Sequence, residues 1–499
     1  MADAIPRPVM DKLGLAAAFA RGTLWSVGLR WGVKLIGLVS TLVLARLLVP
    51  ADFGILAIAM IFVSLIEMIF SLGSDAVVLR DPNAPPDLID SAWTLKALEG
   101  VAAAVLIALL SPLAASFFNE PRLVPVLLVL CIGVVIQGFT SFGPLLARKD
   151  LNFGLEVRLA MGAKVVTFAI TMAIAFWLRN YWALVIGTML GYASGCVMSY
   201  TFHPYRSRFT LSRLREIWNF SQWMMLSSIG SFFTRKNDDF LVAHIASAAD
   251  LGLYSVASDL GQTVSAELSV PINRASLPVL AQFDPASPRL ASVVAMTLAA
   301  SNTLILPAGF GLAAVSDLAV TVVLGAKWSS SAPLLAMFSI AWCLRYMPGI
   351  YSVMAMLKGK PSVLGVLTWT EAGVVLVLGL ALMQYGVEGI AWARCGAAGA
   401  ALMMWLAIGP RIGMSLSTFA SATWRPLCGA LIMFAILRAL PAQLASLAPL
   451  LDLAVRVAVG ASIYTVWILA TWIAVGRPDG IEARALAAAR ALYARVRRT

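Results

Sequence analysis

The sequence predicts an all-α polytopic membrane protein with about 14 transmembrane helices. Hydrophobic residues make up 60% of the 499-residue chain and charged residues only 12%, whereas soluble domains are about a quarter charged. The mean hydropathy is +0.87. Apolar stretches of about 20 residues, the length that crosses a bilayer, recur along nearly the whole chain. The loops between them are under about 20 residues, which is too short for a catalytic domain.

The predicted spans are separated by sequences that favour turns. Proline, glycine and aspartate cluster in "VPAD" (49–52), "RDPNAPPD" (80–87) and "KGKP" (358–361). The first 20 residues lack the apolar core and cleavage site of a secretory signal, so we expect the first span to be retained. The expected spans are 22–45, 53–78, 91–115, 123–146, 155–178, 181–202, 217–245, 251–272, 291–315, 331–356, 362–384, 389–409, 424–440 and 449–475.

Two stretches of the chain are similar to each other. "ARLLVPADFGILAIAM" (45–60) aligns without gaps to "AHIASAADLGLYSVAS" (243–258), and both contain Ala-Asp-x-Gly. Each copy lies between the first and second helix of a predicted six-helix block, which indicates two homologous lobes in parallel orientation. We expect a cytoplasmic N-terminal segment (1–20), an N-lobe (21–215), a C-lobe (216–415), two further helices (416–475) and a basic amphipathic cytoplasmic tail (476–499).

Lys and Arg residues are distributed unevenly over the two sides of the predicted membrane. If the N-terminus is cytoplasmic, 21 of the 37 fall in cytoplasmic segments. The periplasmic loops contain four: Arg46, Arg122, Arg179 and Lys327. The positive-inside rule therefore predicts that both termini are cytoplasmic. The net charge of +12 reflects this topology rather than binding to nucleic acid.

The stretch "RKNDD" (235–239) places four charges in the seventh predicted span. One charge at the centre of a lipid-facing helix costs about 2.5–3.5 kcal/mol, and one large apolar residue returns only about 0.3–0.6 kcal/mol. We therefore expect this stretch to face a polar cavity, to pair with partners, or to lie near the membrane interface.

Other predicted spans also contain charged side chains. Arg30 and Lys34 share one stripe of the first span, while Arg394 lies on the twelfth. We predict a water-filled cationic cavity between the lobes, because Arg and Lys can replace the hydration shell of a phosphate. The predicted substrate-binding residues are Arg30, Lys34, Arg235, Lys236, Arg158, Lys164 and Arg345. The predicted coupling or counter-charge residues are Glu67, Glu99, Asp238, Asp239 and Glu371.

An alternative is that these charges pair with each other and only hold helices together. Lys96 and Glu99 are i, i+3 neighbours, a spacing that favours such a pair. Arg30 and Lys34 have no acidic neighbour on their helix, which favours cavity lining. For the aspartates of RKNDD the sequence leaves both roles open.

The sequence lacks the motifs of most enzymes. It has no G-x-x-x-x-G-K-[ST] loop for nucleotides and no G-x-S-x-G elbow. The five cysteines are scattered and form no C-x-x-C pair, and the two histidines are far apart. We therefore expect neither an enzyme nor a resident metal or cofactor.

Several segments resemble one known family. Residues 21–60, "RGTLWSVGLRWGVKLIGLVSTLVLARLLVPADFGILAIAM", are similar to the opening of bacterial Wzx-type lipopolysaccharide and exopolysaccharide flippases. These belong to the polysaccharide transporter branch of the MOP exporter superfamily. "RKNDDFLVAHIASAADLGLYSVA" (235–257) resembles the second-lobe opening of that branch, and residues 277–290 and 324–338 resemble two further signatures. The resemblance covers most of the chain and is weakest after about residue 410.

The resemblance implies a flippase in the bacterial inner membrane. Its substrate would be an oligosaccharide repeat unit on undecaprenyl pyrophosphate, moved from the cytoplasmic to the periplasmic leaflet by alternating access. Expected partners are membrane lipids and the polysaccharide polymerase and export machinery. At motif level the cationic cavity residues of the family carry over to Arg30, Lys34, Arg235 and Lys236.

Of three alternatives, the first below stays open, whereas the excess of cations argues against the second and the short loops argue against the third. A peptidoglycan-precursor lipid flippase is a close relative. A multidrug exporter of the same superfamily would need an acidic cavity for cationic drugs. A membrane-embedded polysaccharide polymerase or glycosyltransferase would need a large catalytic loop.

Overall fold

The structure, a computed structural model, describes residues 32–80, 84–149, 153–283, 287–440 and 448–476. Within these ranges the chain is helical and contains no β-strand, which confirms the predicted all-α class. Nine helical segments of the described residues are long and apolar enough to cross a membrane, and two of them, Ala326–Leu357 and Ser362–Ile412, each contain two α-helices. The apolar helix Leu123–Gly138 is shorter. The count of about 14 spans stays a prediction.

The chain divides into two compact units, Met1–Phe232 and Phe233–Thr499. The division falls in the middle of a long helix, α9 (Leu214–Ile245), whereas the sequence prediction placed the lobe boundary in the first turn of the same helix, between 215 and 216.

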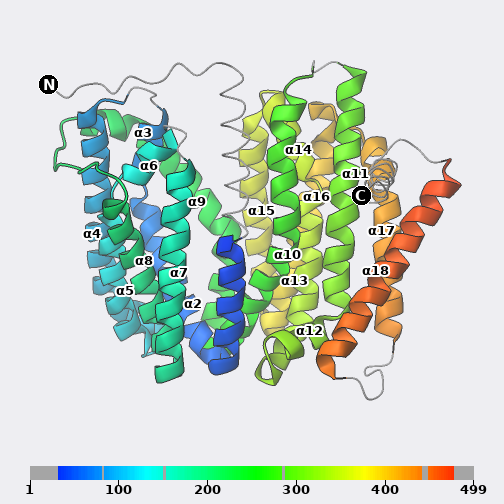
Figure 1. The fold of residues 1–499 in the computed structure, drawn as a ribbon, viewed down its shortest axis with the longest axis horizontal. Coiled ribbons are helices and arrows are strands. Elements are labelled where there is room, and N and C mark those ends of the chain that lie inside the picture. The colour runs from blue at the N-terminus through cyan, green and yellow to red at the C-terminus, as the bar shows by residue number, and fades with distance from the viewer. Residues whose placement is uncertain (1–31, 81–83, 150–152, 284–286, 441–447, 477–499) are drawn as a thin grey trace, which may run out of the picture. The chain divides into compact units, whose positions relative to one another are not determined.

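Unit 1 is a bundle of helices that pack side by side (Figure 1). In this bundle α4 packs on α5, α5 on α8, and α7 on α8, while α2 contacts both α4 and α5. A helix over residues 32–47 comes first. It is followed by α2 (Pro50–Phe70), α3 (Ser74–Arg80), α4 (Pro86–Phe117), α5 (Leu123–Gly138), α6 (Gly143–Lys149), α7 (Phe153–Leu178), α8 (Trp182–Thr201) and the first part of α9.

Two glycines allow α4 and α5 to approach closely. A Cβ added to Gly100 would lie 3.0 Å from the Cα of Gly138, and a Cβ on Gly138 would lie 3.1 Å from the Cα of Gly100. Small residues at a crossing point let membrane helices make backbone contact. Substitution at either position would therefore push these helices apart.

Unit 2 contains the rest of α9 and the helices that follow it. These are α10 (Ala248–Leu280), α11 (Pro288–Ala314), α12 (Ser316–Val323), α13 (Ala332–Tyr346), α14 (Gly349–Leu357), α15 (Pro361–Leu382), α16 (Gly386–Ile408), α17 (Leu416–Ala439) and α18 (Pro449–Ala474). Short 3₁₀ segments at Ala326–Ser331, Met383–Tyr385 and Gly409–Ile412 connect some of them.

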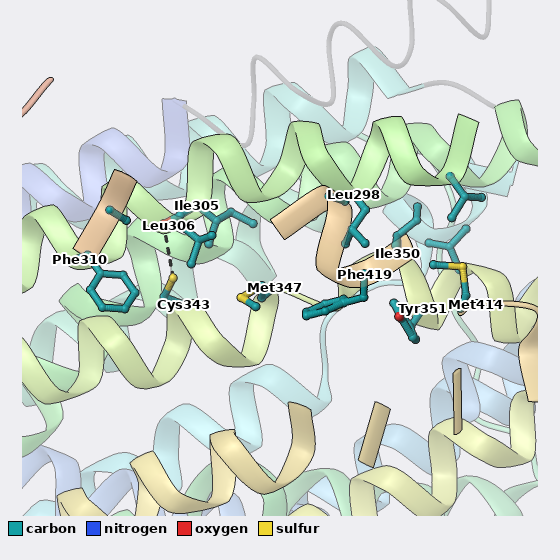
Figure 2. Packing of buried hydrophobic residues seen from close by; sticks show 14 of the residues in the cluster. Leu298, Ile305, Leu306, Phe310, Cys343, Met347, Ile350, Tyr351, Met414 and Phe419 are labelled. Atoms are coloured by element: carbon teal, nitrogen blue, oxygen red, sulfur yellow. Dashed lines mark hydrogen bonds between the residues drawn. The ribbon is translucent and has the colours of Figure 1, made fainter. Parts of the chain in front are cut away.

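The core of unit 2 is formed by large apolar side chains from α11, α13, α14 and α17 (Figure 2). Phe310, Cys343, Tyr351 and Phe419 are all buried there. The Cys343 thiol donates to the Ile305 carbonyl at 3.6 Å, so this cysteine packs in the core without a disulfide.

The last two helices are fixed to unit 2 through α11. The buried Asn302 Nδ2 of α11 donates to the Thr423 Oγ1 of α17 at 2.9 Å. The Tyr464 hydroxyl of α18 donates to the Thr303 carbonyl at 2.9 Å. The helices α17 and α18 therefore belong to the core of unit 2 rather than extending from it.

Three of the predicted spans are broken helices. The span predicted over 53–78 is interrupted between α2 and α3, where Gly73 has φ of +66°, a conformation that favours glycine. The span predicted over 123–146 is interrupted between α5 and α6. The span predicted over 331–356 is interrupted at Pro348, which lacks the N–H that would continue the helix.

The repeated Ala-Asp-x-Gly motif has the same structural role in both units. Asp52 accepts a hydrogen bond from the Val49 N–H at 3.0 Å at the start of α2. Asp250 accepts from the Ser247 N–H at 3.3 Å at the start of α10. Each carboxylate satisfies a backbone donor that a helix start leaves without an intrahelical partner. The repeat therefore begins the second helix of each predicted six-helix block.

Candidate functional site

The RKNDD stretch lies on α9, where helical geometry divides it into two faces. Asn237 and Asp238 are buried, as is Thr234 one turn earlier. Arg235 is exposed, and the Lys236 side chain is 40% exposed. Residues three and four positions apart share a helix face. The stretch therefore has an inner face that packs into unit 2 and an outer face that carries the first two cations.

The inner face forms hydrogen bonds to the backbone of α15. Thr234 Oγ1 donates to the Thr368 carbonyl at 3.2 Å, and Asn237 Nδ2 donates to the Ala372 carbonyl at 3.0 Å. A carbonyl that accepts a helical bond keeps a second lone pair for such a donor. These two contacts fix α9 to α15.

Asp238 contacts groups from two other helices. The Tyr254 hydroxyl of α10 donates to its Oδ2 at 3.0 Å, and the Arg394 Nε of α16 lies 3.8 Å from the same oxygen. Arg394 also donates to the Thr234 carbonyl at 3.0 Å, and its guanidinium lies 4.5 Å from the ring centroid of Trp342 on α13. The side chains of Asp238 and Arg394 are each only 4% exposed. A buried ion pair persists where hydrogen bonds and ring contacts offset its desolvation.

Two further ion pairs complete the charged cluster of unit 2. Lys236 Nζ lies 2.6 Å from Asp239 Oδ2 within α9, and Arg345 Nε of α13 lies 2.7 Å from Glu371 Oε1 of α15. The carboxylates are nearly buried, whereas the side chains of Lys236 and Arg345 are 40% and 31% exposed. Each carboxylate predicted in this unit as a coupling or counter-charge residue thus has a cation within 4 Å.

The predicted site residues of unit 1 are placed differently. Lys34 is half-buried on the helix over 32–47, and Glu67 is half-buried on α2. The helix α7 carries Arg158, which is exposed, and Lys164, which is half-buried. Within the part of the chain that the structure describes, neither Glu67 nor Lys164 has an ion-pair partner within 4 Å. Arg30 lies outside the described residues.

Lys96 pairs with a different carboxylate from the one that its spacing favours. Its Nζ lies 3.1 Å from Asp75 Oδ1 on α3. Glu99, the predicted i+3 partner, is half-buried, and its Oε1 has no hydrogen-bond partner among the described residues. The break between α2 and α3 explains the difference, because it directs Asp75 toward α4, where the two helices pack together.

Sequence reasoning missed several members of these networks. Tyr254 lies in the stretch 235–257 that resembles the family, but the sequence did not indicate that it contacts Asp238. Trp342 gave no signal because aromatic side chains in apolar helices are common. Asp75 lies near the end of an expected span, a position that by itself indicates no partner inside the membrane. Arg394 was visible as a charge on the twelfth span, a position that by itself indicates a polar partner. No group of three or more potential metal-ligating side chains occurs among the described residues.

The chain matches a protein family whose description is "Polysaccharide biosynthesis protein", over residues 43–333. It is 24% identical over 337 residues to the lipopolysaccharide biosynthesis protein WzxC of Escherichia coli (strain K12), covering 66% of this chain and 68% of the relative. It is 23% identical over 481 residues to the succinoglycan biosynthesis transport protein ExoT of Rhizobium meliloti (strain 1021), covering 91% and 94%.

Two groups of solved structures share the fold. The lipid II flippase MurJ in an inward closed conformation superposes with a TM-score of 0.69 at 12% identity, covering 91% of this chain and 99% of that chain. The MATE multidrug transporter DinF-BH superposes with a TM-score of 0.56 at 14% identity, covering 82% and 98%. The helical arrangement is thus one that these membrane transporters also adopt.

Proposed function

The chain belongs to the family of polysaccharide biosynthesis proteins, and from this premise we propose that it flips an undecaprenyl-pyrophosphate-linked oligosaccharide repeat unit. Movement is from the cytoplasmic to the periplasmic leaflet, for exopolysaccharide or O-antigen synthesis. The match of the family over residues 43–333, more than half of the chain, carries this proposal. ExoT, a relative that the chain covers almost completely, is by name a transport protein of succinoglycan biosynthesis.

The protein is a multi-pass membrane transporter rather than an enzyme. We place it in the bacterial inner membrane with both termini in the cytoplasm, because Lys and Arg concentrate in the loops on that side. A polymerase and the export machinery are the expected partners that receive the flipped unit.

The substrate chemistry accounts for cations inside the membrane. A diphosphate must lose part of its hydration shell to cross, and Arg and Lys side chains replace those hydrogen bonds. In unit 1, Lys164 is suited to this role because it is half-buried and no carboxylate lies within 4 Å among the described residues. In unit 2, the exposed outer face of α9 presents Arg235 beside Lys236.

The carboxylates of unit 2 have a different role in this proposal. Asp238 and Glu371 are buried against Arg394 and Arg345, so they neutralise those cations and fix the helices. Substrate then contacts the cations of the outer face, and alternating access moves the diphosphate while the lipid tail stays in the bilayer. Transport of cationic drugs is not favoured, because cations outnumber carboxylates among the predicted site residues.

A peptidoglycan-precursor flippase is the second candidate. The fold shared with MurJ over 91% of this chain favours it, since MurJ is by name a lipid II flippase. Both candidate substrates are lipid-linked sugars, so only their sugar chemistry separates them.

A deletion strain tests the proposal and separates it from this second candidate. We expect cells without the gene to accumulate a lipid-linked oligosaccharide, whose mass identifies the repeat unit. A membrane-impermeant sugar-modifying reagent should fail to reach it, because it stays in the cytoplasmic leaflet. Accumulation of a peptide-bearing disaccharide precursor would support the second candidate instead. Accumulation of reagent-accessible repeat units would point to a polymerase and would sink the flippase proposal.

A further inference from the structure

The segment that connects α8 to α9 is firmly attached to unit 1. Asp90 on α4 accepts hydrogen bonds from the Tyr205 hydroxyl and, at 3.1 Å, from the Arg208 N–H. Thr94 Oγ1, one turn later on α4, accepts from the Thr210 N–H at 3.1 Å. Its own proton is shared between the Asp90 carbonyl at 2.8 Å and the Arg208 carbonyl at 3.3 Å. The connection contains no helix before Leu214, where α9 begins, and these hydrogen bonds hold it against α4.

A third residue of α4 extends this attachment. Ser91, which is fully buried, accepts a hydrogen bond from the Arg213 N–H at 3.3 Å. On the same side Phe209 packs edge-on against the Trp93 ring at a centroid distance of 5.0 Å. The first turns of α4 thus hold the connection along most of its length.

The outward side of this segment is basic. Residues 202–218, which we call the basic segment, contain one acidic residue, Glu216, and four exposed arginines: Arg206, Arg208, Arg213 and Arg215. Arg213 lies 3.5 Å from Glu216. The Arg206 guanidinium is oriented by the carbonyls of His203 and Tyr205 at 2.6 and 3.0 Å.

The same segment exposes large apolar side chains between and on either side of its arginines. Phe209 is 69% exposed, Trp218 55%, Leu211 46% and Phe202 44%. The segment follows directly after α8 and lies against the start of α4, and both helices are candidate membrane spans. Aromatic side chains concentrate at membrane–water interfaces, where their rings lie at the level of the lipid headgroups. These exposed aromatic side chains are therefore typical of a segment at such an interface.

We propose that the basic segment binds the phosphate headgroups of anionic phospholipids in the leaflet on its own side of the membrane. The arginines supply planar forks that match phosphate oxygens, and the exposed apolar side chains enter the headgroup and acyl boundary. Attachment to α4 fixes the arginines in advance, so binding orders little additional chain. Basic residues near an anionic surface each contribute to such binding.

The test is a titration of the detergent-solubilised full chain with dioctanoyl phosphatidylglycerol, with dioctanoyl phosphatidylcholine as the headgroup control. Binding is measured as the rise in the thermal unfolding midpoint with lipid concentration. In the double variant Arg208→Gln and Arg215→Gln the apparent affinity for phosphatidylglycerol should fall about 30-fold. The double variant Lys360→Gln and Arg411→Gln removes two exposed cations elsewhere and should change the affinity less than about twofold.

A variant that keeps every charge distinguishes a binding site with pre-oriented arginines from non-specific electrostatic attraction to the anionic headgroup. Thr94→Val keeps every charge but removes the hydroxyl that holds the basic segment, and we expect an affinity about threefold weaker. Equal losses in both double variants, or equal responses to the two lipids, would overturn the proposal. If inorganic diphosphate raises the thermal unfolding midpoint as much as phosphatidylglycerol does, the site binds free phosphate instead of a lipid headgroup. The assay involves no transport, so its outcome is independent of the proposed substrate.

Discussion

In unit 2, the first helix introduces charges that its neighbours then match. Asp238 on α9 meets Arg394 on α16, and Lys236 pairs within α9 itself. In unit 1 the corresponding first helix over 32–47 carries Lys34, and α7 carries Lys164, with no carboxylate within 4 Å of Lys164 among the described residues. The two units share the repeated capping motif, yet the buried charges of unit 2 are matched by neighbouring helices, whereas Lys164 of unit 1 has no carboxylate within 4 Å among the described residues.

This difference indicates that intramembrane charge in one protein can serve two purposes. A buried, matched charge contributes to the stability of its unit, and its loss should be measured as unfolding. A half-buried, unmatched charge contributes little to stability, and its loss should be measured as transport. The first three predictions below test this separation and the fourth extends it to a partly exposed loop pair, from the largest expected effect to the smallest.

The largest effect is expected for Arg394→Ala. It removes the cation beside Asp238 and over Trp342, which leaves an unpaired buried carboxylate. We expect a loss of about 3–5 kcal/mol in the free energy of unfolding, measured by denaturant titration in micelles. Arg235→Ala, one exposed cation on the outer face of α9, is the control and should cost under about 0.5 kcal/mol. Equal losses in the free energy of unfolding would show that burial does not determine how much each of these two arginines contributes to stability.

The pair Arg345–Glu371 should show strong coupling. Glu371→Gln and Arg345→Gln should each destabilise unit 2, and the double variant should lose less than the sum of the two. A coupling energy of about 1–2 kcal/mol is expected in a double-mutant cycle, because the contact is short and Glu371 is nearly buried. Additive losses would instead mean that the 2.7 Å contact contributes nothing.

Lys164→Gln should lower transport without lowering stability. Loss of one charge-assisted contact to a diphosphate corresponds to about a tenfold slower flipping rate, or about 1.4 kcal/mol. The rate is measured with lipid-linked repeat units in reconstituted vesicles, and Lys164→Arg should restore most of it. Lys327→Gln, an exposed cation in a predicted periplasmic loop, is the matched control and should transport normally. Normal transport by Lys164→Gln would remove this residue from the proposed path.

The smallest effect concerns pH at the loop between α4 and α5. The Arg122 guanidinium donates to Glu120 at 2.7 and 2.8 Å and holds the pKa of that carboxyl below its ordinary value of 4.5. Because the folded pKa is depressed, the contribution is complete above 4.5 and disappears as pH falls through the lower folded value. The pair is partly exposed, so it contributes under about 1 kcal/mol.

Glu120→Gln should therefore lower the thermal unfolding midpoint slightly at neutral pH and leave it unchanged at strongly acidic pH. The comparison requires both proteins at both pH values in the same detergent. A difference that persists in acid would assign the effect to packing rather than to the ionised carboxylate.

The sequence predicted the parts of this protein that depend on composition and local order. Lengths of apolar sequence predicted a helical membrane protein, and the Ala-Asp-x-Gly repeat predicted equivalent helix starts, where Asp52 and Asp250 indeed cap α2 and α10. These features follow from the residues themselves, because helix length, helix capping and insertion cost are set over a few turns of chain. The presence of charge on α9 was visible for the same reason.

The partners of those charges were decided by the tertiary structure alone. Helical periodicity groups Thr234 with Asp238, but it cannot indicate that Arg394, 160 residues after Thr234, donates to its carbonyl. Likewise the spacing of Lys96 and Glu99 favoured a pair, whereas a helix break brought Asp75 to Lys96 instead. A side chain pairs with whatever the packing of other helices places within about 4 Å, and that placement depends on the whole unit.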